Sequence, residues 1–267
     1  MPELPDVEHT RKNLERWMRG ARFARVATTD SRIVRPKKPR TFVNELTGRT
    51  VERVERRGKW LRLTLDDGRR LFIHLGMTGW FEHDETAPRF ERVRFELDRR
   101  GERSSVVYVD SRRWGRMIPA TEDIETWKGL GPDPLADSVD VERLAARLSR
   151  RKGRTIKEAL MDQTILAGVG NVLSTEALWK AKIDPRSRAS AVSTSDLRAI
   201  ARGLRWSIAR TLAHHAKGDE GGRNPFRIYG RKGERCPRCG AELEQVTLGG
   251  RTTVFCPGCQ VRRSPSR

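Results

Sequence analysis

Residues 61–75, LRLTLDDGRRLFIHL, decide the fold class of the first half of the chain. Apolar residues recur at every second position on both sides of Asp67-Gly68, a dipeptide typical of the tight turn between two antiparallel strands. The segment therefore predicts a β-hairpin with one buried face. Alternating runs at 93–97 and 106–109 extend the pattern, so we expect an antiparallel β-sandwich.

A helical pattern precedes these strands at 3–18 and returns after a run of chain breakers. The breakers are GLGPDP at 129–134, which predict a hinge between two domains. Beyond them, apolar residues at helical spacing predict helices at 141–148, 155–162, 171–181 and 197–212. The fold class is thus α+β. The predicted domains are an N-terminal β-sandwich at 1–128, a hinge at 129–137, a helical domain at 138–227, a cysteine-containing hairpin at 228–260 and a basic tail at 261–267.

The charge of the chain is strongly one-sided. It has 55 Lys+Arg against 35 Asp+Glu, a formal net charge of +20 and a pI of about 10.9. Such a field favours polyanions, and nucleic acid first, because neutralised phosphates release counterions. We find no apolar run near 18 residues and no basic-then-apolar signal, so we expect a cytosolic or nucleoid protein without a membrane partner. Charge alone leaves DNA enzymes, ribosomal proteins and RNA-binding proteins open.

Four cysteines form two Cys-x-x-Cys pairs that 16 residues separate. They are Cys236, Cys239, Cys256 and Cys259. Four thiolates fill a tetrahedral coordination sphere, so we predict one zinc ion that is structural and not catalytic. Incidental pairs or disulfides are the alternative, which this compressed spacing disfavours. Apolar residues on both sides of Gly249-Gly250 predict that the segment between the pairs is a zinc β-hairpin.

The first eight residues, MPELPDVE, place a proline directly after the initiator methionine. Removal of Met1 would leave the Pro2 nitrogen as a secondary amine, which can attack an electrophilic carbon and form a cationic iminium. Protons α to that cation become acidic, so leaving groups on the neighbouring carbon can be eliminated. The alternative is that Pro2 only begins a helix, a position where proline is common. These two residues alone favour that alternative.

Further motifs follow in a fixed order along the chain. They are RGKWL at 57–61, HLGMTG at 74–79, DSRRWG at 110–115, LGPDPL at 130–135, IK at 156–157, MDQ at 161–163, GVGN at 168–171, IYGRKG at 228–233 and GR at 250–251. Together with the amino-terminal stretch, this set resembles the formamidopyrimidine-DNA glycosylases and their endonuclease VIII relatives. The resemblance runs from residue 2 to residue 260, and the ordered set is far more specific than any one motif.

The resemblance implies a base excision repair DNA glycosylase with AP lyase activity and a helix–two-turn–helix motif in its helical domain. Pro2 would be the nucleophile, Glu3 its neighbouring general acid, and Lys59 a group that contacts phosphate and transfers protons at the lesion. Without the resemblance, Glu3 is a favourable carboxylate in a first helical turn and Lys59 a solvated strand lysine. The implied partner is double-stranded DNA with damaged bases or abasic sites, bound by a monomer without a catalytic metal.

A base inside a duplex must be flipped out before it can be excised, and the gap must be filled. The resemblance assigns this filling to Met77, Arg112 and Trp114, because Met and Trp can wedge between bases and Arg can bond the unpaired partner. The two apolar residues could instead belong to the core. Phosphate contacts are implied for Lys152, Lys157, Asn171 and Arg251, whose alternatives are solvated surface cations and, for the asparagine, a plain helix cap.

Several positions depart from the family pattern and bear on the choice of lesion. Asp6, which the resemblance places at the lesion pocket, stands where the formamidopyrimidine type usually has Glu. Phe90 replaces a frequent histidine, Trp114 replaces the usual Phe, and the loop 216–227 keeps little family character. Oxidised purines, namely 8-oxoguanine and formamidopyrimidines, are the leading substrates. The alternatives are oxidised pyrimidines, bulky or crosslinked lesions, a catalytically silent damage sensor and a zinc-ribbon RNA-binding protein.

Overall fold

The hairpin predicted around Asp67-Gly68 is present. Strands β3 (Trp60–Leu65) and β4 (Arg70–His74) pair antiparallel, with Leu63 opposite Leu71. Gly68 takes the left-handed conformation that the turn requires, with φ +79°. With β2 (Val51–Arg57) and β8 (Arg116–Ala120) these strands form a four-stranded sheet in the order β2-β3-β4-β8.

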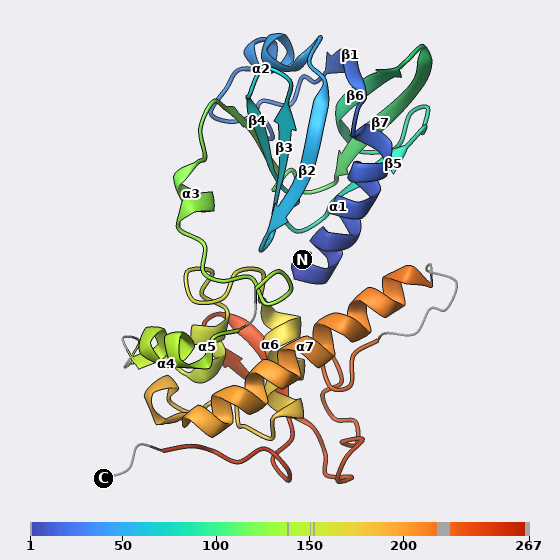
Figure 1. The fold of residues 1–267 in the computed structure, drawn as a ribbon. Coiled ribbons are helices and arrows are strands. Elements are labelled where there is room, and N and C mark those ends of the chain that lie inside the picture. Colours follow the sequence, from blue (N-terminus) through green and yellow to red (C-terminus); the bar gives the residue numbers. More distant parts are fainter. Residues whose placement is uncertain (1, 138, 150, 152, 218–224, 265–267) are drawn as a thin grey trace. The chain divides into compact units, whose positions relative to one another are not determined.

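A second four-stranded sheet faces the first one. It has the order β1-β6-β7-β5, and its strands are β1 (Arg22–Ala27), β5 (Gly79–His83), β6 (Glu91–Arg99) and β7 (Glu102–Asp110). The apolar residues of both sheets share one buried cluster, to which helix α1 (Leu4–Met18) adds Val7 and Leu14. Two short helices also belong to this half of the chain: α2 (Pro39–Leu46), and α3 (Glu125–Lys128) in the connecting chain after β8 (Figure 1).

The computed structural model describes residues 2–137, 139–149, 151, 153–217 and 225–264. They divide into two units: unit 1 holds Pro2 and 6–129, and unit 2 holds 3–5 and the chain from Leu130 onward. The division at Gly129 falls at the start of the predicted hinge. Gly131 and Pro132 hydrogen-bond with Gln163 and Ala167 of unit 2. The hinge motion and the other predicted domain limits stay predictions.

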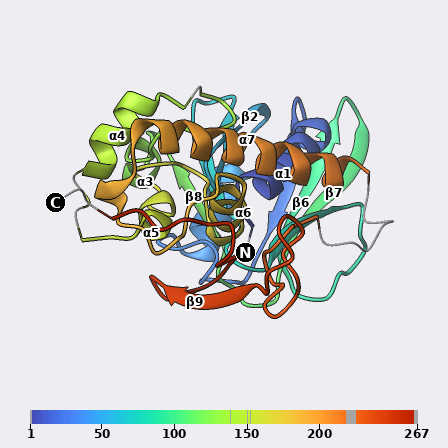
Figure 2. The same cartoon turned by 90° about the horizontal axis from the view of Figure 1, so that it is seen from below.

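Unit 2 is built around helix α6 (Asn171–Lys180), which is buried on nearly all sides. The long helix α7 (Thr194–Ala216) and the hairpin of β9 (Glu244–Leu248) and β10 (Arg251–Phe255) lie on either side of it (Figure 2). The other elements are α4 (Val141–Ser149), α5 (Ile156–Leu160) and the 3-10 turn η1 (Ala189–Ala191). Thr155 and Ser193 begin α5 and α7 with reciprocal capping boxes.

The fold class predicted from the sequence is confirmed: a β-sandwich, a helical part and a zinc-finger hairpin. The predicted elements that follow clear periodicity are found within a few residues of their expected limits. Strands β1, β2, β5 and β8 and the helices α2 and α3 were not predicted. In β1 and β2 the burial does not alternate, as in the buried-exposed-exposed-buried start of β2. Among the described residues, no helix is long and apolar enough to cross a membrane.

Candidate active site and nucleic-acid interface

Glu3 caps a helix that is remote from it in sequence. The N-cap position of α6 is Gly170, which has no side chain to accept the helix's first N–H groups. The Glu3 carboxylate accepts from the backbone N–H groups of Gly170 (3.1 Å), Val172 (2.8 Å) and Leu173 (3.0 Å), and Glu3 is only 3% exposed. The positive end of the helix dipole favours this charge. The residue next to Pro2 is therefore fixed in place.

Lys157 is buried against the N-terminal end of α6. Its Nζ donates to the carbonyl of Asn171 (2.6 Å) and to Oγ1 of Thr175 (2.5 Å), and the side chain has no exposed area. Burial lowers its pKa to about 7, while the charges of Glu3 and Glu176 act to raise it. This burial excludes the alternative that Lys157 is a solvated surface cation, and its contact with phosphate stays a prediction. In this structure the ammonium of Lys157 stabilises the first turns of α6.

Asn171 and the hairpin meet at one place in unit 2. The amide nitrogen of Asn171 donates to the carbonyl of Thr252 at 2.9 Å, and Arg251, the residue before it, is exposed. Asn171 is the first residue of α6 and not its cap. Two residues predicted to contact phosphate thus lie on adjoining segments of unit 2. Lys152, the fourth predicted contact, lies outside the described residues, as does most of the loop 216–227.

Lys59 lies in the two-residue turn between β2 and β3, one residue before the strand in which it was expected. It is mostly buried, and its charge acts on His74, which stands opposite Trp60 on β4. Burial lowers the pKa of His74 to about 4, with Lys59 and Arg116 acting in the same direction. The neutral imidazole accepts the N–H of Gly76 at Nδ1 (3.1 Å). Pro2 and Asp6 are half-buried, and their roles stay predictions.

The three residues predicted to fill the gap lie on two neighbouring turns of unit 1. Met77 precedes β5, and Arg112 and Trp114 follow β7, whose last residue pairs with the first residue of β5. Trp114 is 59% exposed, which excludes the alternative that it is a core residue. The Arg112 guanidinium lies 5.8 Å from the Trp114 ring centroid and donates to the Met77 sulfur at 3.9 Å. The structure therefore brings these three side chains together.

The four cysteines converge as a metal site requires. All four sulfurs lie within 4.8 Å of one another, with Cys236 and Cys259 at 3.8 Å and Cys239 and Cys256 at 3.3 Å. Zinc–sulfur bonds in a tetrahedron place the sulfurs about 3.8 Å apart, so this donor set fits zinc. Trp179 of α6 donates its ring N–H to the Cys236 sulfur at 3.5 Å, which attaches the module to the helical core.

Two buried carboxylates that organise the site were not predicted. Glu176 accepts the backbone N–H groups of Arg227, Ile228 and Tyr229, each at 2.9 Å, and so fixes the chain that leads into the zinc module. Asp110, described below, does the same for a loop of unit 1. The donors to Glu176 are backbone groups about 50 residues further along the chain, and the backbone donors to Asp110 lie in the loop that directly follows it. For Glu3, by contrast, the glycine at the start of α6 is a local signal that a capping partner must come from elsewhere.

Comparison with known families extends over nearly the whole chain. Residues 1–117 match the formamidopyrimidine-DNA glycosylase N-terminal domain, 130–220 match the H2TH domain of the same enzymes, and 233–261 match the zinc finger found in FPG and IleRS. The formamidopyrimidine-DNA glycosylase of Herpetosiphon aurantiacus is 34% identical over 97% of this chain and all of its own length. The chain belongs to the formamidopyrimidine-DNA glycosylase family. Its members are bifunctional glycosylases and AP lyases.

Other relatives agree with this assignment. The formamidopyrimidine-DNA glycosylase of Thermosynechococcus vestitus is 37% identical, with 97% of both chains covered. A solved structure of the Lactococcus lactis enzyme, bound non-covalently to DNA with an AP site, superimposes with a TM-score of 0.86 at 29% identity. It covers 97% of this chain and 100% of that one. The same enzyme bound to Fapy-dG DNA gives a TM-score of 0.87. Zinc is accordingly the metal of the four-cysteine finger.

Proposed function

We propose that this chain excises oxidised purines from double-stranded DNA and cleaves the resulting abasic site, with the Pro2 amine as nucleophile. The observation that carries this proposal is the anchoring of Glu3. Its carboxylate is fixed by three backbone N–H donors. A proton-transfer group is thus held in place at the residue next to the Pro2 amine. Preorganisation of this kind lowers the entropic part of the barrier. We further propose that the enzyme acts as a monomer on double-stranded DNA with damaged bases or abasic sites, in the cytosol or nucleoid.

The reaction begins with the lone pair of the Pro2 nitrogen. After removal of Met1, this nitrogen bonds C1′, and the glycosidic bond breaks with its electron pair on the base, which leaves protonated. The nitrogen loses its proton, and the C1′–O4′ bond then breaks with its electron pair on O4′, which takes a proton from Glu3, so that the open sugar carries an iminium at C1′. This iminium accepts electrons from the neighbouring C–H bond. Loss of one proton expels the 3′ phosphate, and loss of a second expels the 5′ phosphate. Glu3 and Lys59 hold and move the protons of these steps.

Borohydride trapping tests the nucleophile directly. Reduction of the iminium on an abasic-site duplex should join protein and DNA covalently, and digestion with trypsin should place the adduct on the peptide 2–11. An adduct on the peptide that contains Lys59 would instead identify a lysine as nucleophile. If the protein without Met1 gives no adduct at all, the chain is a silent damage-binding protein and the proposed chemistry is wrong.

Pro2→Gly and Glu3→Gln provide matched variants for this assay. Pro2→Gly leaves a primary amine, so it should slow trapping while binding of a damaged duplex stays near normal. Glu3→Gln keeps the shape of the side chain but removes its charge. We expect base excision to fall by about 100-fold or more, as for other acid–base groups. A large loss of affinity in Pro2→Gly would show that the proline is structural.

Oxidised pyrimidines are the second candidate substrate class. A solved structure of the similar Lactococcus lactis enzyme contains DNA with an oxidised pyrimidine, and Asp6 shortens the carboxylate predicted at the lesion pocket of this chain. A nicking panel of duplexes with 8-oxoguanine, a formamidopyrimidine, an oxidised pyrimidine or a crosslink decides between the classes. We expect the oxidised purines to be cut fastest. Asp6→Glu should change the ranking of lesions without change at a preformed abasic site.

A further inference from the structure

Asp110 is the most heavily hydrogen-bonded carboxylate of unit 1 and is completely buried. It ends β7 and lies below the wedge loop, by which we mean residues 111–115. One oxygen, Oδ1, accepts from Thr78 Oγ1 (2.6 Å) and the Arg112 N–H (3.1 Å). The other, Oδ2, accepts from the N–H groups of Trp114 (2.9 Å) and Gly115 (2.8 Å) and from the Tyr108 hydroxyl (3.4 Å). Every one of these partners is a donor, and the Tyr108 hydroxyl shares its single proton with the Leu75 carbonyl oxygen at 3.2 Å.

The same carboxylate joins the wedge loop to the turn that carries Met77. Thr78, the next residue, donates to Asp110 and accepts the Arg112 N–H at 3.2 Å. Glycines permit this close approach: a Cβ on Gly76 would lie 2.5 Å from the Trp114 carbonyl carbon, and one on Gly115 would overlap the Tyr108 hydroxyl. The two turns are therefore one rigid assembly that needs Asp110 at its centre.

A second carboxylate holds the loop from its other side. Arg113 has the left-handed φ of +57°, which is strained for a residue with a side chain. Its guanidinium forms two hydrogen bonds to Asp30, at 2.6 and 3.0 Å. Burial acts to raise the pKa of Asp30, but bonds from Arg113 and the Arg32 N–H outweigh it, so the pKa lies below its ordinary value. The Asp30 pair thus compensates the strained backbone of Arg113.

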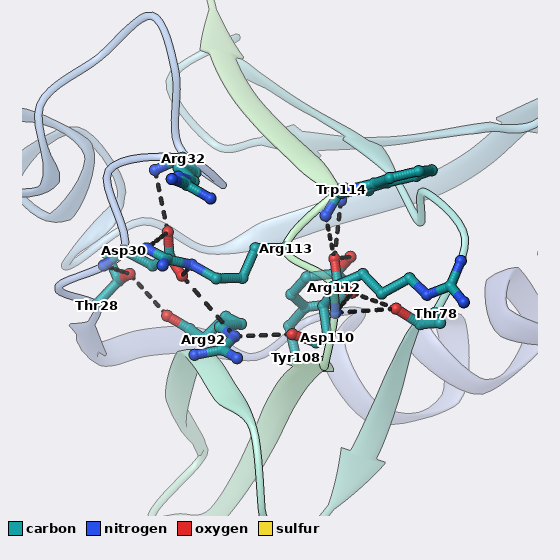
Figure 3. Close-up of polar contacts among 11 residues, drawn as sticks. Thr28, Asp30, Arg32, Thr78, Arg92, Tyr108, Asp110, Arg112, Arg113 and Trp114 are labelled. Atoms are coloured by element: carbon teal, nitrogen blue, oxygen red, sulfur yellow. Dashed lines mark hydrogen bonds and ion pairs between the residues drawn. The ribbon is translucent and has the colours of Figure 1, made fainter.

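The hydrogen bonds to Asp110 involve no side-chain atom of Arg112 or Trp114. Figure 3 shows both side chains extending away from the Asp110 carboxylate on one side, while Arg113 points in the opposite direction toward Asp30. Asp110 touches the two wedge residues only through their backbone N–H groups. The conformation of the loop is therefore set without use of the side chains that would enter DNA.

We propose that Asp110 is a positioning residue for base flipping: it fixes the wedge loop and the Met77 turn so that Met77, Arg112 and Trp114 enter the duplex together. This inference rests on the proposed function. Asp110 does not touch the reacting sugar in this role, so its loss should slow extrusion of the base and leave the sugar chemistry intact. A preorganised wedge avoids the cost of ordering the loop at the moment of insertion.

Asp110→Asn is the principal test. The amide keeps one acceptor oxygen but replaces the other with an NH2 group, whose N–H donors would point at the N–H and O–H donors around this position. We expect single-turnover excision of 8-oxoguanine from a duplex to fall at least about 10-fold, as for other misplaced groups. The fluorescence rise of 2-aminopurine beside the lesion, which reports unstacking, should be slowed to the same degree. Borohydride trapping on single-stranded abasic-site DNA needs no flipping, so it should stay within about twofold of wild type.

Thr78 supplies a second pair of variants that is independent of the folding of Asp110→Asn. Thr78→Ser keeps the hydroxyl and should excise like wild type, whereas Thr78→Val should show the same selective defect as Asp110→Asn. Leu97→Ala is the control for reduced stability, because Leu97 lies in the same core at the opposite end of β6 and β7. It should lower the melting temperature without a defect in flipping.

Three outcomes overturn the inference: wild-type excision by Asp110→Asn, an equal loss of trapping on single-stranded DNA, or a flipping defect in Leu97→Ala of the same size. They differ from failure of the proposed function, in which the wild-type protein itself forms no adduct. A trapping-competent wild type whose Asp110→Asn variant flips bases normally would remove the positioning role alone.

Discussion

At the scale of single residues, the key interactions join buried carboxylates to backbone N–H groups. Glu3, Glu176 and Asp110 each accept at least three such donors. Hydrogen bonds to charged groups contribute about 1.5–3 kcal/mol each. The sequence predicts Glu3 as functional by resemblance, but not its partners. Every residue except proline has the same backbone N–H group, so the sequence does not show which of these groups will bind a carboxylate.

His74 allows a prediction at this scale. Its pKa is about 4 in the folded protein and about 6.5 in an unfolded chain. As the pH falls through this window, only the unfolded chain takes up the proton, so the free energy of unfolding decreases. His74→Asn keeps an acceptor for the Gly76 N–H and removes the titration. Between pH 7 and pH 5 the wild type should lose about 2 kcal/mol more than the variant.

Urea denaturation at the two pH values, followed by fluorescence, measures this difference. Above pH 7 the two proteins should show the same dependence on pH, since both states of His74 are then neutral. Equal losses between pH 7 and pH 5 would show that His74 is not the source.

At the scale of elements, α6 organises unit 2. Its first turn receives Glu3, its middle holds Glu176, and its last turn presents Trp179 to the zinc module. The helical spacing of apolar residues predicts this helix, because that spacing depends only on residues that are close together in the sequence. Its partners come from segments far away along the chain, which explains why they could not be predicted. The burial of Lys157, which excludes a solvated surface position, has the same cause.

Gly203 of α7 gives a prediction for the contact between α6 and α7. In an ordinary helix interior, Gly→Ala stabilises by about 0.5–1 kcal/mol. At this position a Cβ would lie 2.6 Å from the carbonyl oxygen of Ala177, so Gly203→Ala should instead destabilise the protein by about 1–3 kcal/mol. Thermal denaturation measures the sign. Gly153→Ala, where a Cβ has no heavy atom within 4 Å, is the control, and a stabilised Gly203→Ala would contradict the close packing.

At the scale of the whole molecule, charge and motif order predicted more than local geometry did. The excess of +20 indicated a polyanionic partner, and the ordered motifs indicated the family that the comparisons confirm. Both properties are distributed over the chain and do not depend on any single contact. Charge and motif order do not give the position of single side chains. For Trp114, the sequence left open whether the side chain is buried in the core or exposed, and only the conformation of the loop shows that it is exposed.

The salt dependence of DNA binding tests the predicted interface at this scale. Removal of one phosphate-binding cation should reduce the slope of log K against log salt by about 0.9. Arg251→Ala should therefore weaken binding of damaged and undamaged duplexes equally and flatten the slope by about 1. Fluorescence anisotropy at a series of salt concentrations measures both quantities. Arg25→Ala, which removes an exposed arginine paired with Glu96, is the control. An unchanged slope in Arg251→Ala would exclude a phosphate contact.

Asp110 binds the wedge loop through backbone N–H groups, and this has a consequence for how readily the enzyme can evolve. The side chains at 77, 112 and 114 can be exchanged without loss of the hydrogen bonds that shape their turns. Trp114, where the family usually has Phe, is such an exchange. A new preference for the base opposite the lesion thus requires few mutations and no redesign of the scaffold. In directed evolution, libraries at these three positions should yield a high proportion of folded variants.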